Sequence, residues 1–217
     1  MHAAFPFALI ALAAAAQPIV LERSGDIYYR AADGAERRLT DGAGYSEARL
    51  SPDGRTAVFV HRDKAADANG WGGETSLWIA DLPTGRARRL LAPKPDDDVK
   101  RDMGSFRNPV FSLDGGYVYV EADAWATSSA IHQVSLATGR ERFVVDGWLY
   151  GVLRNGPYRG YLVVGQHRYF GPPNYGSYNP VSVVRPDGKV LLRVPGSDKD
   201  DGETSLERWL RSKGWTL

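Results

Sequence analysis

A pattern of two hairpins that returns along the chain constrains the fold more than any other feature of the sequence. Its clearest copy runs from Leu50 to Leu91. The first half reads Leu-Ser-Pro-Asp-Gly-Arg-Thr-Ala-Val-Phe-Val, and the second reads Leu-Trp-Ile-Ala-Asp-Leu-Pro-Thr-Gly-Arg-Ala-Arg-Arg-Leu. In each half two β-rich runs flank a turn that ends in glycine, which is typical of a hairpin. Both halves return at Phe111–Val120 and Val134–Val144. A repeat of this length predicts a β-propeller or a similar array.

The turns of the outer hairpins give the spacing of the repeat. Their glycines, Gly34, Gly85, Gly139 and Gly188, are about fifty residues apart, which fits four-stranded blades with loops between them. We expect four units, of which the first is partial because it lacks its innermost strand. The expected strands are 19–22, 27–30 and 36–39; 47–50, 57–62, 77–81 and 86–90; 110–111, 117–121, 131–136 and 141–145; 150–154, 161–167, 181–185 and 190–194.

The two ends of the chain differ from the repeats. Residues 1–16 hold an apolar run too short to cross a bilayer as a helix, and it ends in three alanines, the small-residue pattern of a signal-peptide cleavage site. Near the other end, Thr204-Ser-Leu-Glu207 is a capping-box pattern that predicts a helix to about Lys213, covering an end of the array. The expected domains are a signal peptide at 1–16, a propeller-like domain at 17–196, and a polar linker with the helix at 197–217.

Charge and cysteine content narrow the classes of partner and compartment. The formal net charge of +1 over 217 residues gives no electrostatic reason to expect nucleic acid. We expect no membrane insertion once the signal peptide is removed. The chain has no cysteine, so it has neither a disulfide nor a thiolate ligand. Export without cysteine favours a bacterial periplasm.

The motif Ser51-Pro-Asp-Gly-Arg, followed by Leu77-Trp-Ile-Ala-Asp, resembles the repeat of TolB-like β-propellers, the WD40-like PD40 repeat. The third unit keeps the pattern with Leu113 in place of the proline. The resemblance implies an all-β propeller of about four blades with a short C-terminal helix. Propellers with this repeat have more blades, so three arrangements stay open: a compact ring, an open arc capped by the helix, or an arc completed by a second chain.

The expected connections differ between the two faces of such an array. Chain direction alternates in antiparallel blades, so the turns within hairpins lie on one face and the other connections on the opposite face. The turns are tight, whereas the other connections are long and aromatic. Loops on a rigid scaffold commonly carry binding sites, and exposed aromatic residues commonly anchor partners. The alternative is that these rings pack against one another as a lid over the core. The candidate binding residues are Trp71, Trp125, Tyr169, Tyr175 and Tyr178.

Three histidines are expected on the side that carries the long loops. His61 and His167 end second strands of their units, and His132 begins a third strand. Metal-assisted chemistry needs two or three imidazoles around one ion. Because each histidine belongs to a different unit, we prefer scattered histidines with local hydrogen bonds, and we expect no metal or cofactor. The sequence also lacks the Gly-x-Ser-x-Gly motif of many hydrolases and a phosphate loop.

The sequence therefore predicts an exported, non-catalytic binding or scaffold protein of the periplasm. Its aromatic-loop face would bind a periplasmic or envelope protein, or a glycan. One alternative is a metal-dependent, lyase-like enzyme acting on carbohydrate at the same face. The other is a structural module that is completed by forming a homodimer.

Overall fold

The computed structural model describes residues 16–68, 72–125, 127–173, 175–199 and 202–217. Four antiparallel sheets follow the four expected units, and we call them blades 1 to 4 in chain order. Blade 1 contains β1 (Ile19–Arg23), β2 (Asp26–Arg30) and β3 (Glu36–Arg38). Blade 2 contains β4 (Tyr45–Leu50), β5 (Thr56–Lys64), β6 (Glu74–Asp81) and β7 (Arg86–Leu91). Blade 3 contains β8 (Phe106–Phe111), β9 (Tyr117–Trp125), β10 (Ser128–Ser135) and β11 (Glu141–Asp146). Blade 4 contains β12 (Trp148–Val152), β13 (Leu162–Gly165), β16 (Val181–Val184) and β17 (Val190–Arg193).

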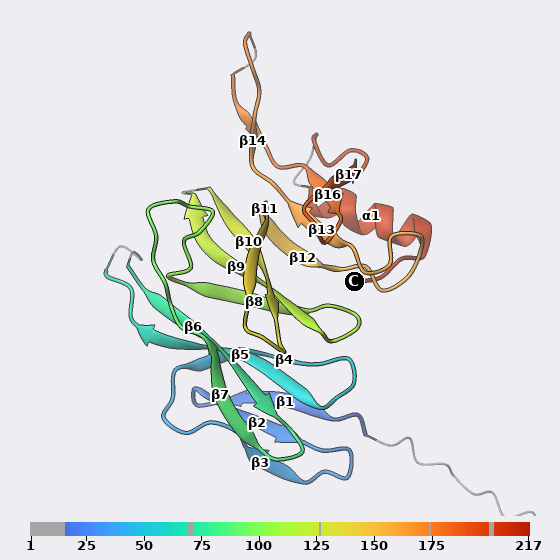
Figure 1. Ribbon diagram of the computed structural model, residues 1–217. Helices are drawn as coiled ribbons and strands as arrows, with labels where there is room; N and C mark the ends of the chain where they lie inside the picture. Colours follow the sequence, from blue (N-terminus) through green and yellow to red (C-terminus); the bar gives the residue numbers. More distant parts are fainter. Residues whose placement is uncertain (1–15, 69–71, 126, 174, 200–201) are drawn as a thin grey trace, which may run out of the picture.

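The blades stack along the chain as an open arc. Figure 1 shows blade 1 at one end of the stack and blade 4 at the other. Among the described residues, no sheet contains strands of both. Blade 1 also lacks an innermost strand there, as the sequence predicts. The sequence left open a ring and two kinds of arc, and the described chain forms an arc.

The same local hydrogen bonds form the inner turns of blades 2 and 3. The hydroxyl of Ser51 donates to Asp53 Oδ1 at 2.6 Å, and the hydroxyl of Ser112 donates to Asp114 Oδ1 at 2.6 Å. These hydroxyls lower the pKa of both carboxyls. The glycine that follows, such as Gly54 with a φ of 69°, takes the left-handed conformation that the turn needs. The Ser, Asp and Gly of the repeated motif therefore form the turn, so the motif tolerates leucine in place of proline at its second position.

The core lies between the blades, because alternate residues of a strand face opposite neighbours. In β5, Phe59 packs toward blade 1 and Val58 packs toward blade 3, and both are fully buried. Tyr119 of β9 and Leu162 of β13 fill the space between blades 3 and 4. Each blade is thus fixed by its neighbours, and the ends of the stack need separate cover.

Helix α1 (Glu203–Lys213) covers the outer face of blade 4, as expected. Leu206 is buried against Val181 and Val183, and Trp209 packs beside it. The expected start of the helix is wrong: Gly202 is the N-cap, so Thr204 lies inside the first turn. No helix in the described part of the chain is long and apolar enough to cross a membrane.

Charged residues cover the outer face of blade 1. Glu36 accepts hydrogen bonds from Arg23 at 2.9 Å and from Arg30 at 3.1 Å. Arg38 pairs with Asp26 at 2.6 Å, also on this face. In blade 2, by contrast, Trp78 and Ala80 pack against the preceding blade. A face covered with paired charges is costly to bury against another sheet, so it ends the stack.

Candidate functional site

The long connections and the tight turns lie on opposite sides of the arc. In Figure 1 the β5–β6 and β9–β10 connections lie on the left, and the β4–β5 and β8–β9 turns lie on the right. We call the first side the loop face and the second the turn face. The sequence predicts this asymmetry, because it follows from strand direction alone.

Three adjoining hollows open on the loop face. The first, of about 540 Å³, is lined by residues of blades 1 to 3; the second, of about 460 Å³, lies between blades 2 and 3; the third, of about 490 Å³, lies between blades 3 and 4. The first two share Ser105 and Arg107, and the last two share Trp125. Because neighbouring hollows share lining residues, they form a row on this face, which we call the loop-face groove.

The third hollow brings two predicted binding residues together. Trp125 is the last residue of β9 and is 37% exposed, and Tyr169 belongs to the short strand β14 (Arg168–Tyr169) and is 71% exposed. Both residues line this hollow, although 43 residues lie between them in the sequence. Two exposed rings therefore stand at one cavity, as a binding site requires.

Polar groups beside these rings are held in place by hydrogen bonds. Arg168 pairs with Asp146 at 2.5 Å, and Gln166 Nε2 donates to the backbone carbonyl of Asp146 at 3.1 Å. His167 Nδ1 lies 2.8 Å from Asn179 Oδ1. When the histidine donates this bond, its Nε2 is free to accept one from a ligand. The third hollow thus offers a fixed cation, a carboxylate and an imidazole beside two rings.

Arg107 forms the wall between the first and second hollows. It pairs with Asp123, lies 3.4 Å from Glu121 Oε2, and donates to Ser129 Oγ at 2.7 Å. Burial by itself lowers the pKa of Arg107, but the two carboxylates outweigh burial and raise it. Lys64 in the second hollow is similarly paired with Glu74, at 3.4 Å. The cations named here are neutralised by carboxylates of the groove itself.

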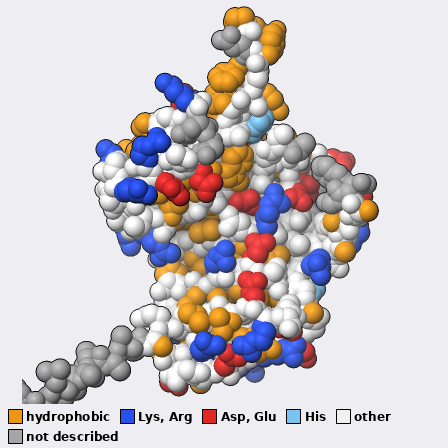
Figure 2. Space-filling model, turned by 180° about the vertical axis from the view of Figure 1, so that it is seen from behind, with side chains coloured by type: hydrophobic (Ala, Val, Ile, Leu, Met, Phe, Trp, Pro, Cys, Tyr) orange, Lys and Arg blue, Asp and Glu red, His pale blue; other side chains and the backbone are white. Residues whose placement is uncertain are grey.

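The two other described candidates lie on a hairpin that the sequence did not predict. Strands β14 and β15 (Ser177–Tyr178) form a two-stranded ribbon that projects from blade 4. Tyr178 stacks on Phe170 with 4.5 Å between ring centroids, so it supports the hairpin. Tyr175 is 83% exposed and lies beyond the groove lining. Figure 2 shows apolar side chains on this projecting segment. Trp71, the remaining candidate, lies outside the described residues.

The histidines have separate local partners. His61 Nδ1 lies 2.9 Å from Asp63, and His132 Nδ1 lies 3.0 Å from Glu141. The expectation for His132 is wrong: it lies in the middle of β10, fully buried between strands, and does not begin the strand. Within the described ranges, no group of three or more His, Asp or Glu side chains has the geometry of a metal site.

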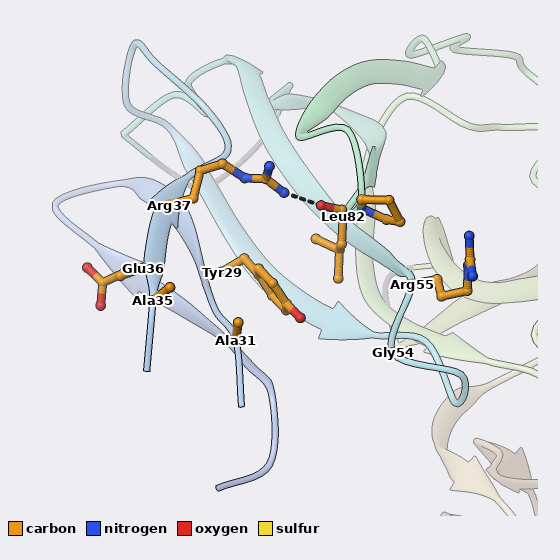
Figure 3. Close-up of a pocket in the computed structure, with 9 residues that line it drawn as sticks. Tyr29, Ala31, Ala35, Glu36, Arg37, Gly54, Arg55 and Leu82 are labelled. Carbon is orange, nitrogen blue, oxygen red and sulfur yellow. Dashed lines mark hydrogen bonds between the residues drawn. The ribbon is translucent and has the colours of Figure 1, made fainter. Parts of the chain in front are cut away.

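Another hollow, of about 450 Å³, opens on the turn face between blades 1 and 2. Figure 3 shows Tyr29, Leu82 and Arg37 around it, with Arg37 donating to the carbonyl of Leu82. A second wedge of about 320 Å³ opens on this face between blades 3 and 4. Such gaps arise where twisted sheets splay apart, and none of the four predicted binding residues that the structure describes lines either one.

Sequence reasoning missed several residues of the groove. Arg107, Asp146 and Arg168 carry no local motif, and their importance follows from ion pairs between strands. His167 was singled out only as a metal candidate. Its position directly before Arg168 and Tyr169, at the start of the aromatic loop, could have indicated a place in the binding site.

Comparisons with known proteins were made by family, by sequence and by structure. No family model matches the chain, and no curated protein matches its sequence. Solved structures do match it. Dipeptidyl peptidase 4 of Porphyromonas gingivalis gives a TM-score of 0.57 at 9% identity over 82% of this chain and 31% of that chain. TolB of Acinetobacter baumannii gives 0.51 at 17% identity over 80% and 38%. A puromycin hydrolase mutant gives 0.52 at 20% identity over 83% and 30%.

These matches agree on architecture. The chain spans about a third of the length of the solved chains that it matches. At 9% to 20% identity, the likeness shows a common fold and leaves activity undetermined.

Proposed function

Since the chain has the TolB-like β-propeller fold that its repeats resemble, we propose that it is a non-catalytic binding module whose loop-face groove holds an extended partner. The observation that carries this proposal is the sharing of Arg107 and Trp125 between neighbouring hollows. A row of adjoining hollows suits a ligand that is long and narrow, whereas a compact small molecule would need only one hollow. Its partner is a periplasmic or envelope protein or a glycan.

The rigidity of the scaffold supports binding at this face. The groove lies along strands that are locked between buried interblade clusters. Trp125 and Arg107 lie at the ends of β9 and β8, where side-chain positions follow from the sheet. A preformed site of this kind loses little conformational entropy when it binds.

The metal-dependent alternative is not taken further. It needs His61, His132 and His167 to act together, and His132 is fully buried in blade 3 with its Nδ1 engaged by Glu141. The likeness to peptidases and hydrolases is a likeness of propeller domains, and their chemistry is not carried over at such low identity.

The homodimer alternative is also set aside in favour of a monomer. Helix α1 covers blade 4, and ion pairs of Glu36 and Asp26 cover blade 1. The ion pairs distinguish the outer face of blade 1, which also carries Ile19, Leu21 and Tyr28, from the apolar faces that blades use to pack on one another. Location in the periplasm follows in this proposal from the signal-peptide pattern of residues 1–16.

Site-specific photocrosslinking in the producing cells tests the proposal. A benzophenone amino acid at Tyr169 lies in the groove, and the same group at Tyr117, 41% exposed near the β8–β9 turn, is the matched control on the turn face. Benzophenone inserts into C–H bonds of proteins and sugars alike. We expect a discrete adduct from position 169 and none from 117. Identical products from both positions, or no adduct from 169, would contradict the proposed function.

A further inference from the structure

We propose that the extended ligand of the loop-face groove is a neutral glycan, a chain of uncharged pyranose units. This inference rests on the proposed function and narrows it to one class of ligand. The groove's aromatic walls, its internally paired charges and the pairing of its strands each bear on the choice.

The aromatic walls suit the apolar faces of sugar rings. Trp125 and Tyr169 are exposed and line one hollow of about 490 Å³. A pyranose with equatorial hydroxyls presents flat patches of C–H groups above and below its ring. Such patches stack on the negative face of an indole or phenol through dispersion and C–H contacts. The hollow is at the lower end of the size range of ligand sites, and it fits one or two sugar units.

The polar groups of this hollow match hydroxyl groups, which both donate and accept hydrogen bonds. Arg168 and Asp146 form an ion pair at the cavity, so a donor and an acceptor lie side by side. Thr127 and Ser128, which carry hydroxyl groups, line the same hollow. Neighbouring hydroxyls of a sugar can bond to such a pair in both directions.

The charges of the groove disfavour an anionic polymer. Carboxylates outnumber cations among the residues that line the three hollows. Arg107 pairs with Asp123, Lys64 with Glu74, and Arg168 with Asp146. At three of the four cations of the groove a polyanion would have to compete with a carboxylate already in place, and Arg62 in the first hollow is the exception among the described residues. A neutral chain leaves each pair intact.

Strand pairing disfavours an extended peptide. A peptide that binds along a sheet uses a free strand edge for its backbone hydrogen bonds. Strand β9, whose last residues line the second and third hollows, is paired with β10 along its length and with β8 as far as Ala122. The body of β9 therefore has no open strand edge, and a peptide could pair only with its last three residues or with the short ribbon of β14 and β15.

The test is calorimetric titration of the purified full chain with three hexasaccharides of equal length. Cellohexaose and hexa-N-acetylchitohexaose are neutral, and hexagalacturonate is anionic. We expect at least one neutral chain to bind with little dependence on salt, and its disaccharide to bind about tenfold more weakly because it fills one hollow only. Tyr169→Ala should weaken binding by about tenfold or more. Tyr117→Ala, a matched exposed tyrosine near the turn face, should bind as the unaltered protein does.

Each other result overturns the glycan assignment. It fails if neither neutral hexasaccharide binds at millimolar concentration, if hexagalacturonate binds more tightly, or if Tyr169→Ala binds as well as Tyr117→Ala. Tyr169 is 71% exposed, so its replacement does not threaten folding, and circular dichroism checks this. The photocrosslinking at position 169 separates the two proposals. A discrete protein adduct there, with no oligosaccharide binding, would keep the binding function and reject the glycan.

Discussion

The carboxylate of Glu121 in blade 3 accepts the backbone N–H of Leu149 in blade 4, at 2.7 Å. The same arrangement recurs along the arc. Glu22 of blade 1 accepts the N–H of Ala48 at 2.9 Å, and Glu47 of blade 2 accepts the N–H of Asn108. Each recipient strand has a register shift near this point, which frees a backbone group for bonding outside the sheet. One glutamate per interface thus fixes each blade to the next.

Replacing Glu121 tests the contribution of these contacts to stability. The carboxylate is 5% exposed and also accepts Asn108 Nδ2 at 2.9 Å. Glu121→Ala leaves these donors unsatisfied, so we expect a loss of about 2–4 kcal/mol in the free energy of unfolding. Urea denaturation measures it. Glu207→Ala, at an exposed position on α1, should change stability by less than about 0.5 kcal/mol. Equal effects of the two changes would mean that Glu121 does not join the blades.

A second prediction concerns the helix that covers blade 4. Leu206 is 3% exposed and packs on Val181 and Val183. Leu206→Ala should lower the free energy of unfolding by about 2–4 kcal/mol, because it removes buried methyl groups and leaves a cavity. Leu191→Ala, at a side chain that is 37% exposed, is the matched control and should cost much less. If the two variants unfold at the same urea concentration, α1 does not seal the blade.

The hairpins were predictable from the sequence because their determinants are local. Ser51, Asp53 and Gly54 form a turn from three neighbouring residues, so the motif reports the structure wherever it occurs. The hairpin of β14 and β15 was not predictable, since each strand has two residues and depends on the pairing of Arg168 with Tyr178. Strands of that length carry no alternation to read.

The sequence was enough to predict the face that carries the candidate site and some of the residues that line it. Strand direction places Trp125 and Tyr169 on the loop face, and the fold then brings them to one hollow. Arg107 was not predictable, because it matters as the wall between two hollows, which only the packing of blades 2 and 3 creates. The helix start was misplaced because Gly202 takes a φ of 77° and ends the preceding loop, two residues before Thr204.

A third prediction concerns pH and the charged end of the arc. Burial opposes ionisation of Asp26, but hydrogen bonds from Arg38 and Thr40 outweigh it and lower the pKa of this carboxyl from 3.8. The folded state therefore favours the ionised form. Its stabilising effect is fully present above the ordinary pKa and is lost as pH falls through the lowered pKa. From pH 6 to pH 3, unfolding free energies of the unaltered protein should fall more than those of Asp26→Asn. Asp97→Asn, at an exposed site, should follow the unaltered protein. If the unfolding free energies of all three proteins fall equally with pH, Asp26 does not contribute to the pH dependence of stability.

A fourth prediction concerns association. Paired charges at Glu36 and Arg30 cover the free face of blade 1. We expect sedimentation equilibrium of the chain from residue 17 onward to give a monomer at micromolar concentration. The double change Arg30→Val and Glu36→Val should create an apolar strip and promote self-association. A dimer of the unaltered chain that Arg30→Val and Glu36→Val disrupts would instead mean that this face is an interface.

The most direct test of the groove asks whether Trp125 and Tyr169 face one cavity. The chain has no natural cysteine, so Trp125→Cys with Tyr169→Cys provides the only two thiols. A short bismaleimide should link them rapidly within one molecule, because both positions line the third hollow. The matched pair Tyr117→Cys with Tyr169→Cys should remain unlinked under the same conditions. Equal linking of both pairs, or no linking of the 125–169 pair, would contradict a single cavity between Trp125 and Tyr169 and with it the groove as the binding site.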